Sequence, residues 1–122
     1  MILVCFLEEG PYCSPKMWQV LANNFQAELH MIRIRKDWEH ELQDVINQYS
    51  HRTWVRLTPH GTIDLRFFEH PADEDVVYFV GPDAKPCPSI PGAYNVTIPL
   101  MKEGHAITAM AMALWDRART LS

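Results

Sequence analysis

Cysteine is scarce, and the spacing of the few cysteines argues against a structural disulfide. The 122-residue chain has three, Cys5, Cys13 and Cys87, with no Cys-x-x-Cys pair. An odd, widely spaced set fits a reducing compartment better than a disulfide framework, so we predict a cytoplasmic protein. Cys13 precedes a predicted helix and is a candidate nucleophile, but no base partner is visible in the sequence, and inert thiols are the simpler interpretation.

An excess of positive charge is also missing. The formal net charge is -4 at pH 7. Proteins that coat nucleic acid by bulk electrostatics carry strongly basic faces, so this balance argues against that class. A local basic patch remains open.

No apolar run is long enough to cross a membrane. The first run covers residues 1–7 and ends at Glu8 and Glu9, whereas a membrane-spanning helix needs about 20 apolar residues. The run also lacks the basic flank of a signal peptide. We therefore interpret it as a buried strand and predict no membrane association.

The histidines show no metal-ligand spacing. The sequence has neither His-Glu-x-x-His nor a pair of histidines one helical turn apart with carboxylates nearby. A metal site is therefore not expected. The histidines in question are His30, His40, His51, His60 and His70.

Apolar runs alternate with helix-like segments along the chain. Hydrophobic residues make up 48% of it, enough for one core, and no linker or repeat interrupts it, so we predict a single domain over residues 1–122. Short apolar runs predict buried strands at residues 2–7, 29–34, 53–57, 76–80 and 94–100. Helical spacing predicts helices from Pro15, after a cap at Asp37, and over residues 106–119.

Apolar residues at helical spacing define the predicted buried faces of the first two helices. The first face holds Met17, Trp18, Leu21 and Phe25, and the second holds Trp38, Leu42, Val45, Ile46 and Tyr49. Residues 62–75 fit neither a helix nor a strand clearly.

This alternation predicts an α/β fold, a mostly parallel sheet covered by helices on both faces. Ligands of such sheets gather beyond the carboxyl ends of the strands, here the loops at residues 8–14, 57–61, 81–91 and 99–105. The third loop contains four prolines, which exclude helix and central strand and predict a stiff surface or ligand-lining segment.

Three segments resemble motifs of the SPOUT (α/β-knot) class of RNA methyltransferases. Residues 76–83 (VVYFVGPD) resemble its second motif, an apolar strand that ends in glycine and is followed by an acid. Residues 94–100 (YNVTIPL) and the helix at 103–119 resemble its third motif. The resemblance is good over residues 53–119 and only architectural before them.

Within this class the pattern is most similar to the archaeal tRNA cytidine 2'-O-methyltransferase family. Members of that family also run a strand into Leu-Thr and a turn that ends in glycine. They place a Tyr-Asn-Val strand before a histidine that opens an alanine-rich last helix ending in Asp-Arg. The matching positions are Leu57, Thr58, Gly61, Tyr94, Asn95, Val96, His105, Asp116 and Arg117.

The resemblance implies a homodimer with a C-terminal trefoil knot that binds S-adenosylmethionine and methylates a ribose 2'-hydroxyl of a structured RNA, most plausibly tRNA. It also implies that backbone groups of three knotted loops enclose the cofactor. The implied cofactor residues are Leu57, Thr58, Gly61, Gly81, Pro82, Asp83, Ile98, Pro99, Leu100 and His105. With no appended RNA-binding domain, RNA affinity is expected to be modest and salt-sensitive.

The sequence departs from the class at two positions. Ribose methyltransferases of the class usually carry an arginine early in the first helix, but residues 14–20 contain only Lys16 as a cation, and lysine lacks the planar fork of arginine. The Ser-x-Asn signature of one branch is replaced by Glu103-Gly104-His105. Two alternatives therefore stay open: a knotted dimer that binds without methyl transfer, and a flavodoxin-like or hydrolase-like enzyme that uses Cys13 or His60.

The candidate catalytic residues are Lys16, Glu9 and His105. His105 opens a helix, where a neutral imidazole is favoured and can act as a base or contact the cofactor, or simply cap the helix. Glu8 and Glu9 can accept a proton, or they are solvated loop acids.

Basic residues at six positions are candidates for RNA contact, with a solvated charged face as the alternative. They are Lys16, Arg33, Arg35, Lys36, Lys85 and Lys102. The last helix is apolar on more than one face, at Met110, Met112, Leu114 and Trp115. We interpret this width as a dimer interface, with burial in the helix's own core as the alternative.

Overall fold

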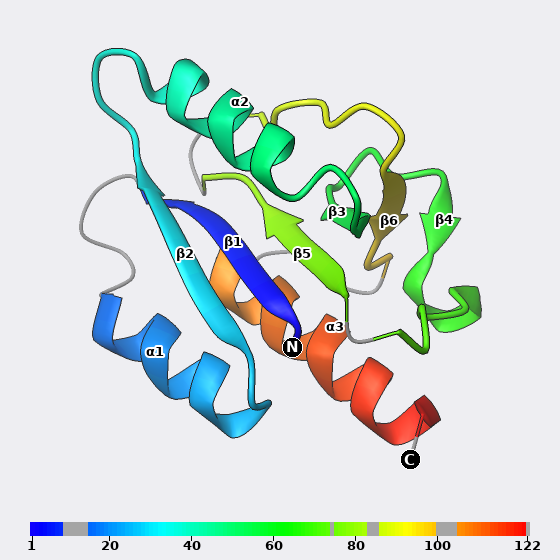
Figure 1. Cartoon of the computed structure of the whole chain (residues 1–122). Coiled ribbons are helices and arrows are strands. Elements are labelled where there is room, and N and C mark those ends of the chain that lie inside the picture. The colour runs from blue at the N-terminus through cyan, green and yellow to red at the C-terminus, as the bar shows by residue number, and fades with distance from the viewer. Residues whose placement is uncertain (9–14, 74, 83–85, 100–104, 122) are drawn as a thin grey trace.

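The structure, a computed structural model, describes residues 1–8, 15–73, 75–82, 86–99 and 105–121. Strands and helices alternate through most of this chain (Figure 1). In order they are β1 (Leu3–Glu8), α1 (Pro15–Asn24), β2 (Glu28–Arg33), α2 (Trp38–Gln48), β3 (Thr53–Leu57), β4 (Ile63–Asp64), the 3-10 turn η1 (Leu65–Phe67), β5 (Val76–Val80), β6 (Tyr94–Thr97) and α3 (Ala106–Leu121).

The strands form one sheet in the order β2-β1-β5-β3-β6-β4, and every pairing is parallel. Helices α1 and α3 lie on one face of the sheet and α2 lies on the other (Figure 1). This arrangement confirms the predicted α/β fold with a parallel sheet flanked by helices.

The two faces of the sheet carry two separate cores, because side chains alternate between faces along each strand. On β1, Val4 and Phe6 join the core under α1 and α3, whereas Leu3, Cys5 and Leu7 join the core under α2. All five residues of β5 are buried, as a central strand covered on both faces requires.

An aromatic stack ties α1 to the sheet. The Phe6 ring stacks on the Trp18 indole with their centroids 3.9 Å apart, and both side chains are buried. Burial of side chains of this size contributes about 1.5–3 kcal/mol each. Trp18 with Leu21 and Ala22 therefore defines the inward face of α1.

The predicted boundaries of β1, β2, β3 and β5 hold to within one residue, and three other local expectations are wrong. The strand β6 ends at Thr97 rather than at residue 100, consistent with Pro99, which has no amide to donate to a ladder. Met17 is exposed rather than part of the buried face of α1. Asp37 makes no capping bond with its side chain, because its backbone is left-handed (φ 66°) and not in the extended conformation that capping needs.

A buried hydrogen-bonded network joins the segment after η1 to β5 and α3. Nδ1 of His70 lies 2.7 Å from the Tyr78 hydroxyl, and Nε2 lies 2.7 Å from Oδ2 of Asp116. A neutral imidazole protonated on Nε2 satisfies both contacts, since the Tyr78 hydroxyl then donates to Nδ1 and Nε2–H donates to the carboxylate. Arg119 donates to the other oxygen of Asp116 at 2.7 Å.

Burial lowers the pKa of His70, because the dry site penalises the imidazolium form. Asp116 acts in the opposite direction, and Arg117 and Arg119 lower the pKa further. Burial also raises the pKa of the Tyr78 hydroxyl, which keeps that group protonated as a donor. The network is therefore built for a neutral histidine.

We predict that the protein loses stability on acidification through His70. The pKa of His70 in the folded state lies below the ordinary value of 6.5. Its stabilisation is therefore complete above pH 6.5 and is lost as the pH falls from there toward the folded-state pKa. The variant His70→Gln should lower the free energy of unfolding by about 1–3 kcal/mol at pH 8 and flatten the decline below pH 6.5.

Urea denaturation from pH 8 to pH 5.5 measures both effects. His40→Gln is the matched control, because the His40 side chain is 82% exposed on α2. Equal acid sensitivity of His70→Gln and the unsubstituted protein would assign the decline to other groups.

Candidate functional site

The central strands β3, β5 and β6 end at one edge of the sheet. Leu57 is level with Val80 of β5 on one side and with Val96 of β6 on the other. The segments that follow these three strands therefore begin side by side. They belong to three of the four loops that the sequence predicts to gather a ligand, at residues 57–61, 81–91 and 99–105.

The connection between β3 and β4 crosses over β6, because β6 lies between these two strands in the sheet. The Thr58 amide donates to the Val96 carbonyl at 3.0 Å, and the Gly61 amide donates to the Thr58 carbonyl at 3.1 Å. A Cβ atom at Gly61 would lie only 2.6 Å from the carbonyl carbon of Val96 and 2.7 Å from the amide nitrogen of Thr97. Glycine at this position permits the crossing.

A second glycine holds the segment after β5 close to the end of that strand. A Cβ atom at Gly81 would lie 2.7 Å from the Cα atom of Cys87. Gly81 and Pro82 are both buried. Burial raises the pKa of the Cys87 thiol, while Arg56 and a backbone hydrogen bond with Gly81 act in the opposite direction.

Sequence reasoning missed Arg56, a residue of β3 that contacts both the segment after β5 and the strand β6. Its guanidinium donates to the carbonyl oxygens of Cys87 and Pro88, both at 2.6 Å, and to Oδ1 of Asn95 at 3.0 Å. The available signal was an arginine among the apolar residues Trp54, Val55 and Leu57 of β3.

The structure brings most of the predicted cofactor residues to this edge with different exposure. Leu57, Thr58, Gly81 and Pro82 are buried. Gly61 and Ile98 are half-buried and Pro99 is exposed. The predicted residues Asp83 and Leu100 lie outside the described residues.

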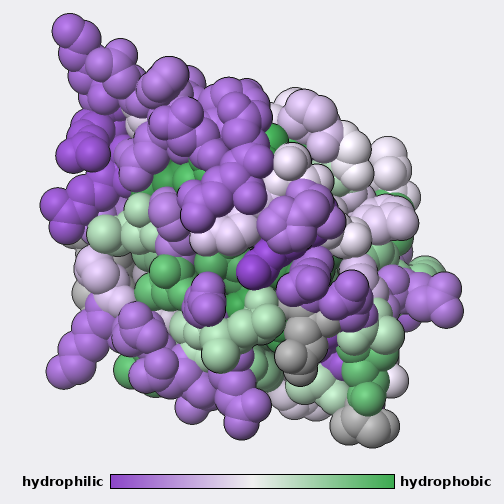
Figure 2. All heavy atoms as spheres, viewed as in Figure 1, coloured by the Kyte–Doolittle hydropathy of each residue, from purple (hydrophilic) through white to green (hydrophobic). Residues whose placement is uncertain are grey.

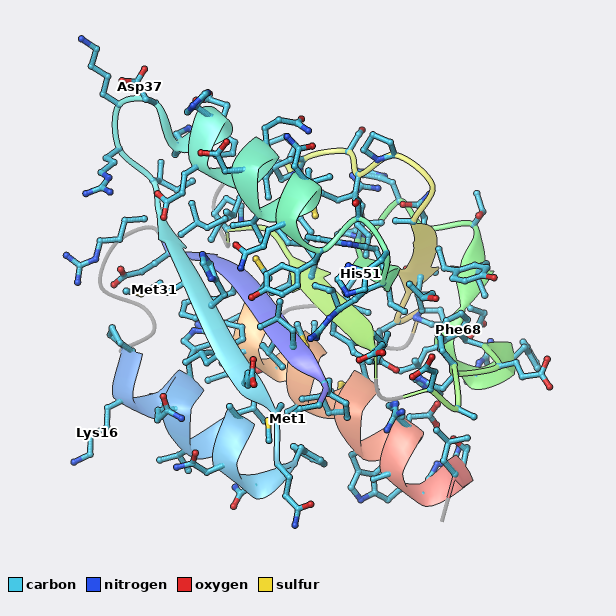
Figure 3. The ribbon with its side chains drawn as sticks, in the orientation of Figure 1. Met1, Lys16, Met31, Asp37, His51 and Phe68 are labelled. Carbon is cyan, nitrogen blue, oxygen red and sulfur yellow. The ribbon has the colours of Figure 1, made fainter. Side chains whose placement is uncertain are left out.

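The candidate catalytic residues belong to different elements. Lys16 lies in the first turn of α1, is exposed, and points away from the sheet (Figure 3). His105 directly precedes α3, is exposed, and accepts hydrogen bonds on its carbonyl from the amides of Thr108 and Ala109. Glu8 forms an ion pair with Arg33 at 3.3 Å, while Glu9 lies outside the described residues.

Basic candidates for RNA contact gather where β2 leads into α2. Arg33 pairs with Glu8, and Arg35 pairs with Glu41 at 3.7 Å. Lys36 is exposed in the same turn, whose surface is strongly hydrophilic (Figure 2). The candidates Lys85 and Lys102 lie outside the described residues.

The described residues also include histidines, carboxylates and thiols of the kinds that bind metal ions or act as nucleophiles. Among these residues no three His, Cys, Asp or Glu side chains gather as metal ligands. No helix formed by them is long and apolar enough to span a membrane. Burial, with a smaller contribution from Glu41, raises the pKa of Cys5 to about 12, so this thiol stays protonated. Cys13 lies outside the described residues.

We predict that Gly61→Ala destabilises the protein by about 2–3 kcal/mol, because the added methyl group meets the backbone of β6. Gly92→Ala is the control: Gly92 has a φ of +76° but open space around its Cβ position. The cost there should be about 1 kcal/mol from backbone strain alone, and Gly92→Asn should recover part of it. Equal urea midpoints for the two alanine variants would contradict the tight crossing.

Comparison with known proteins gives a match in structure but not in sequence. No protein-family model and no curated protein matches the sequence. A crystal structure of a Bacillus anthracis protein, described as a presumed RNA methyltransferase, matches with a TM-score of 0.71 and 18% sequence identity over 99% of this chain and 94% of that chain. At this identity the likeness establishes a shared fold, and at this coverage the shared fold extends over nearly the whole of both chains.

Proposed function

We propose that the protein binds S-adenosylmethionine at the edge formed by β3, β5 and β6 and methylates a ribose 2'-hydroxyl of a structured RNA, with tRNA as the expected substrate. The observation that carries the proposal is the pair of glycines packed on backbone at this edge, Gly61 on β6 and Gly81 on Cys87. The fold shared with a presumed RNA methyltransferase supports it. The motif resemblance of residues 53–119 suggests the cofactor and the reaction.

The residues at this edge fit a compact nucleotide cofactor. Gly61 and Gly81 let their loops pack directly on β6 and on Cys87, and ligands of parallel sheets bind among the loops beyond such strand ends. When bound, S-adenosylmethionine supplies an electrophilic methyl group. The residues proposed to hold it are Leu57, Thr58, Gly61, Gly81, Pro82, Asp83, Ile98, Pro99, Leu100 and His105.

The chain's own contribution to the reaction is to orient the acceptor hydroxyl and to take its proton. We assign proton acceptance to His105 or Glu9, and phosphate contact near the reacting ribose to Lys16. Lysine is a flexible point charge, so it orients phosphate less strictly than the arginine of the SPOUT class. This substitution favours a second candidate function, a dimer that binds the cofactor and RNA without methyl transfer.

The proposal includes a knot. The connection between β3 and β4 already crosses β6. If the chain after β6 passes back under that connection, the last segments form the trefoil knot of the SPOUT class, one of the rare exceptions to unknotted folding.

We further propose a homodimer through α1 and α3. Met112 is 39% exposed and Trp115 is 61% exposed on α3. Met17 and Val20 are both more than half exposed on α1, which covers the same face of the sheet. Apolar side chains gathered on two helices of one face are typical of an association surface. By contrast, the outward surface of α2, on the other face of the sheet, is mostly hydrophilic (Figure 2).

We predict that S-adenosylmethionine stabilises the protein and that its methyl group reaches tRNA. At a ligand concentration about 100 times the dissociation constant, binding adds about 2.7 kcal/mol, which raises the melting temperature of a domain of this size by roughly 10 °C or more. Labelled methyl groups should appear in bulk tRNA and, after nuclease digestion, in 2'-O-methylnucleosides. Lys16→Ala should reduce transfer at least about tenfold without changing cofactor binding.

Gln19→Ala is the matched control, because Gln19 is an exposed residue one turn further along α1. Stabilisation without methyl transfer would support the binding-only candidate. No stabilisation by S-adenosylmethionine or its demethylated product would refute the proposed function and leave the hydrolase-like alternative.

We predict that Trp115→Glu weakens self-association at least about tenfold, because a buried charge replaces an aromatic anchor at the interface. Sedimentation velocity over a range of protein concentrations measures the effect. Phe67→Glu is the control, since Phe67 is 80% exposed on η1, outside α1 and α3. A monomer at all concentrations before substitution, or equal weakening by both variants, would contradict this interface.

A further inference from the structure

Arg56 occupies a position on β3 where an apolar side chain would be expected. Its neighbours Val55 and Leu57 belong to the core under α1 and α3, so alternation places Arg56 on the face that α2 covers. Trp54, on β3, packs in the core of that second face. Arg56 is half-buried there, beneath the segment that follows β5.

That segment needs hydrogen-bond donors from outside itself. Residues 86–91 include Pro86, Pro88 and Pro91. Proline has no amide hydrogen, so the segment cannot pair as a regular strand, yet its carbonyl groups still require partners where they are buried. Arg56 supplies two donors on one planar group, to the carbonyl oxygens of Cys87 and Pro88. Lysine lacks this fork.

The same guanidinium joins three pieces of the edge. Arg56 belongs to β3, its Nη1 donates to Asn95 on β6, and its other two bonds reach the segment after β5. Cys87, one of the two carbonyl acceptors, is also the residue on which Gly81 packs. Displacement of Cys87 would therefore remove the backbone and side-chain atoms on which Gly81 packs.

We propose that Arg56 is a positioning residue that fixes the segment after β5 and thereby sets the shape of the cofactor pocket. This inference rests on the proposed function for its ligand. Its first step, the anchoring of residues 86–91, is independent of any ligand. Arg56 acts through Cys87, Pro88 and Asn95 and is not assigned any contact with the cofactor.

The test combines ligand affinity with hydrogen exchange in Arg56→Met and Arg56→Lys. Arg56→Met should raise the dissociation constant for S-adenosylmethionine at least about tenfold, measured by calorimetry. It should also speed amide exchange in residues 86–93, where the Ala93 amide donates to the Ile90 carbonyl. Arg56→Lys keeps the positive charge but lacks the planar guanidinium, so we expect it to restore neither the ligand affinity nor the slow exchange fully. It replaces Arg56→Met in both measurements if that variant does not fold.

Arg52→Met is the matched control. Arg52 is also half-buried and donates to a backbone carbonyl, that of Met1 at 3.0 Å, but it directly precedes β3 at the opposite end of that strand. It should lower stability without changing ligand affinity or exchange in residues 86–93.

The outcomes separate this inference from the proposed function. If the unsubstituted protein binds no S-adenosylmethionine, the proposed function fails, and exchange alone decides the role of Arg56. Unchanged exchange in residues 86–93 of both Arg56 variants would overturn the inference. The inference would also be overturned if Arg56→Met bound S-adenosylmethionine as tightly as Arg52→Met does, despite faster exchange in residues 86–93.

Discussion

The crossing of the β3–β4 connection over β6 is the constraint on which the rest of the candidate site depends. Because β6 lies between β3 and β4 in the sheet, the connection between β3 and β4 must cross β6. The backbone of this connection approaches that of β6 so closely that only glycine fits at position 61. Hydrogen bonds from Thr58 to Val96 and from Thr97 to Pro59 then hold the two segments together. The edge is shaped mainly by backbone contacts, which explains why a ligand site there need not have a conspicuous set of catalytic side chains.

Two polar arrangements complete the fold, a half-buried one on the face under α2 and a buried one on the face under α3. On the face under α2, Arg56 provides donors for a proline-rich segment that has few of its own. On the face under α3, His70 links Tyr78 with Asp116 and thereby joins the segment after η1 to the last helix. Buried polar groups are costly unless their hydrogen bonds are satisfied, so each arrangement favours one placement of its segment over others.

The sequence predicts local features well and distant partnerships poorly. β3 and β5 have the predicted bounds because each is a short apolar run closed by glycine, proline or polar residues. β4 has only two residues and exists through pairing with β6, more than 30 positions away, so no local pattern could identify it. Arg56 and His70 also look like surface residues locally, because their partners in α3 or in the segment after β5 lie 31 to 46 positions away.

Charge also limits how the proposed RNA substrate could be held. A chain with net charge -4 repels RNA at long range, so binding must depend on a few local cations, and Arg33 and Arg35 already pair with Glu8 and Glu41. Exposed pairs of this kind contribute only about 0–1 kcal/mol, so a phosphate could displace either carboxylate at little cost. With so few local cations the affinity of one chain for RNA would be modest, and the second chain of the proposed dimer would add contacts without a second loss of overall freedom. Under the proposed function, the exposed apolar residues of α1 and α3 would then aid RNA binding only indirectly, by holding two chains together.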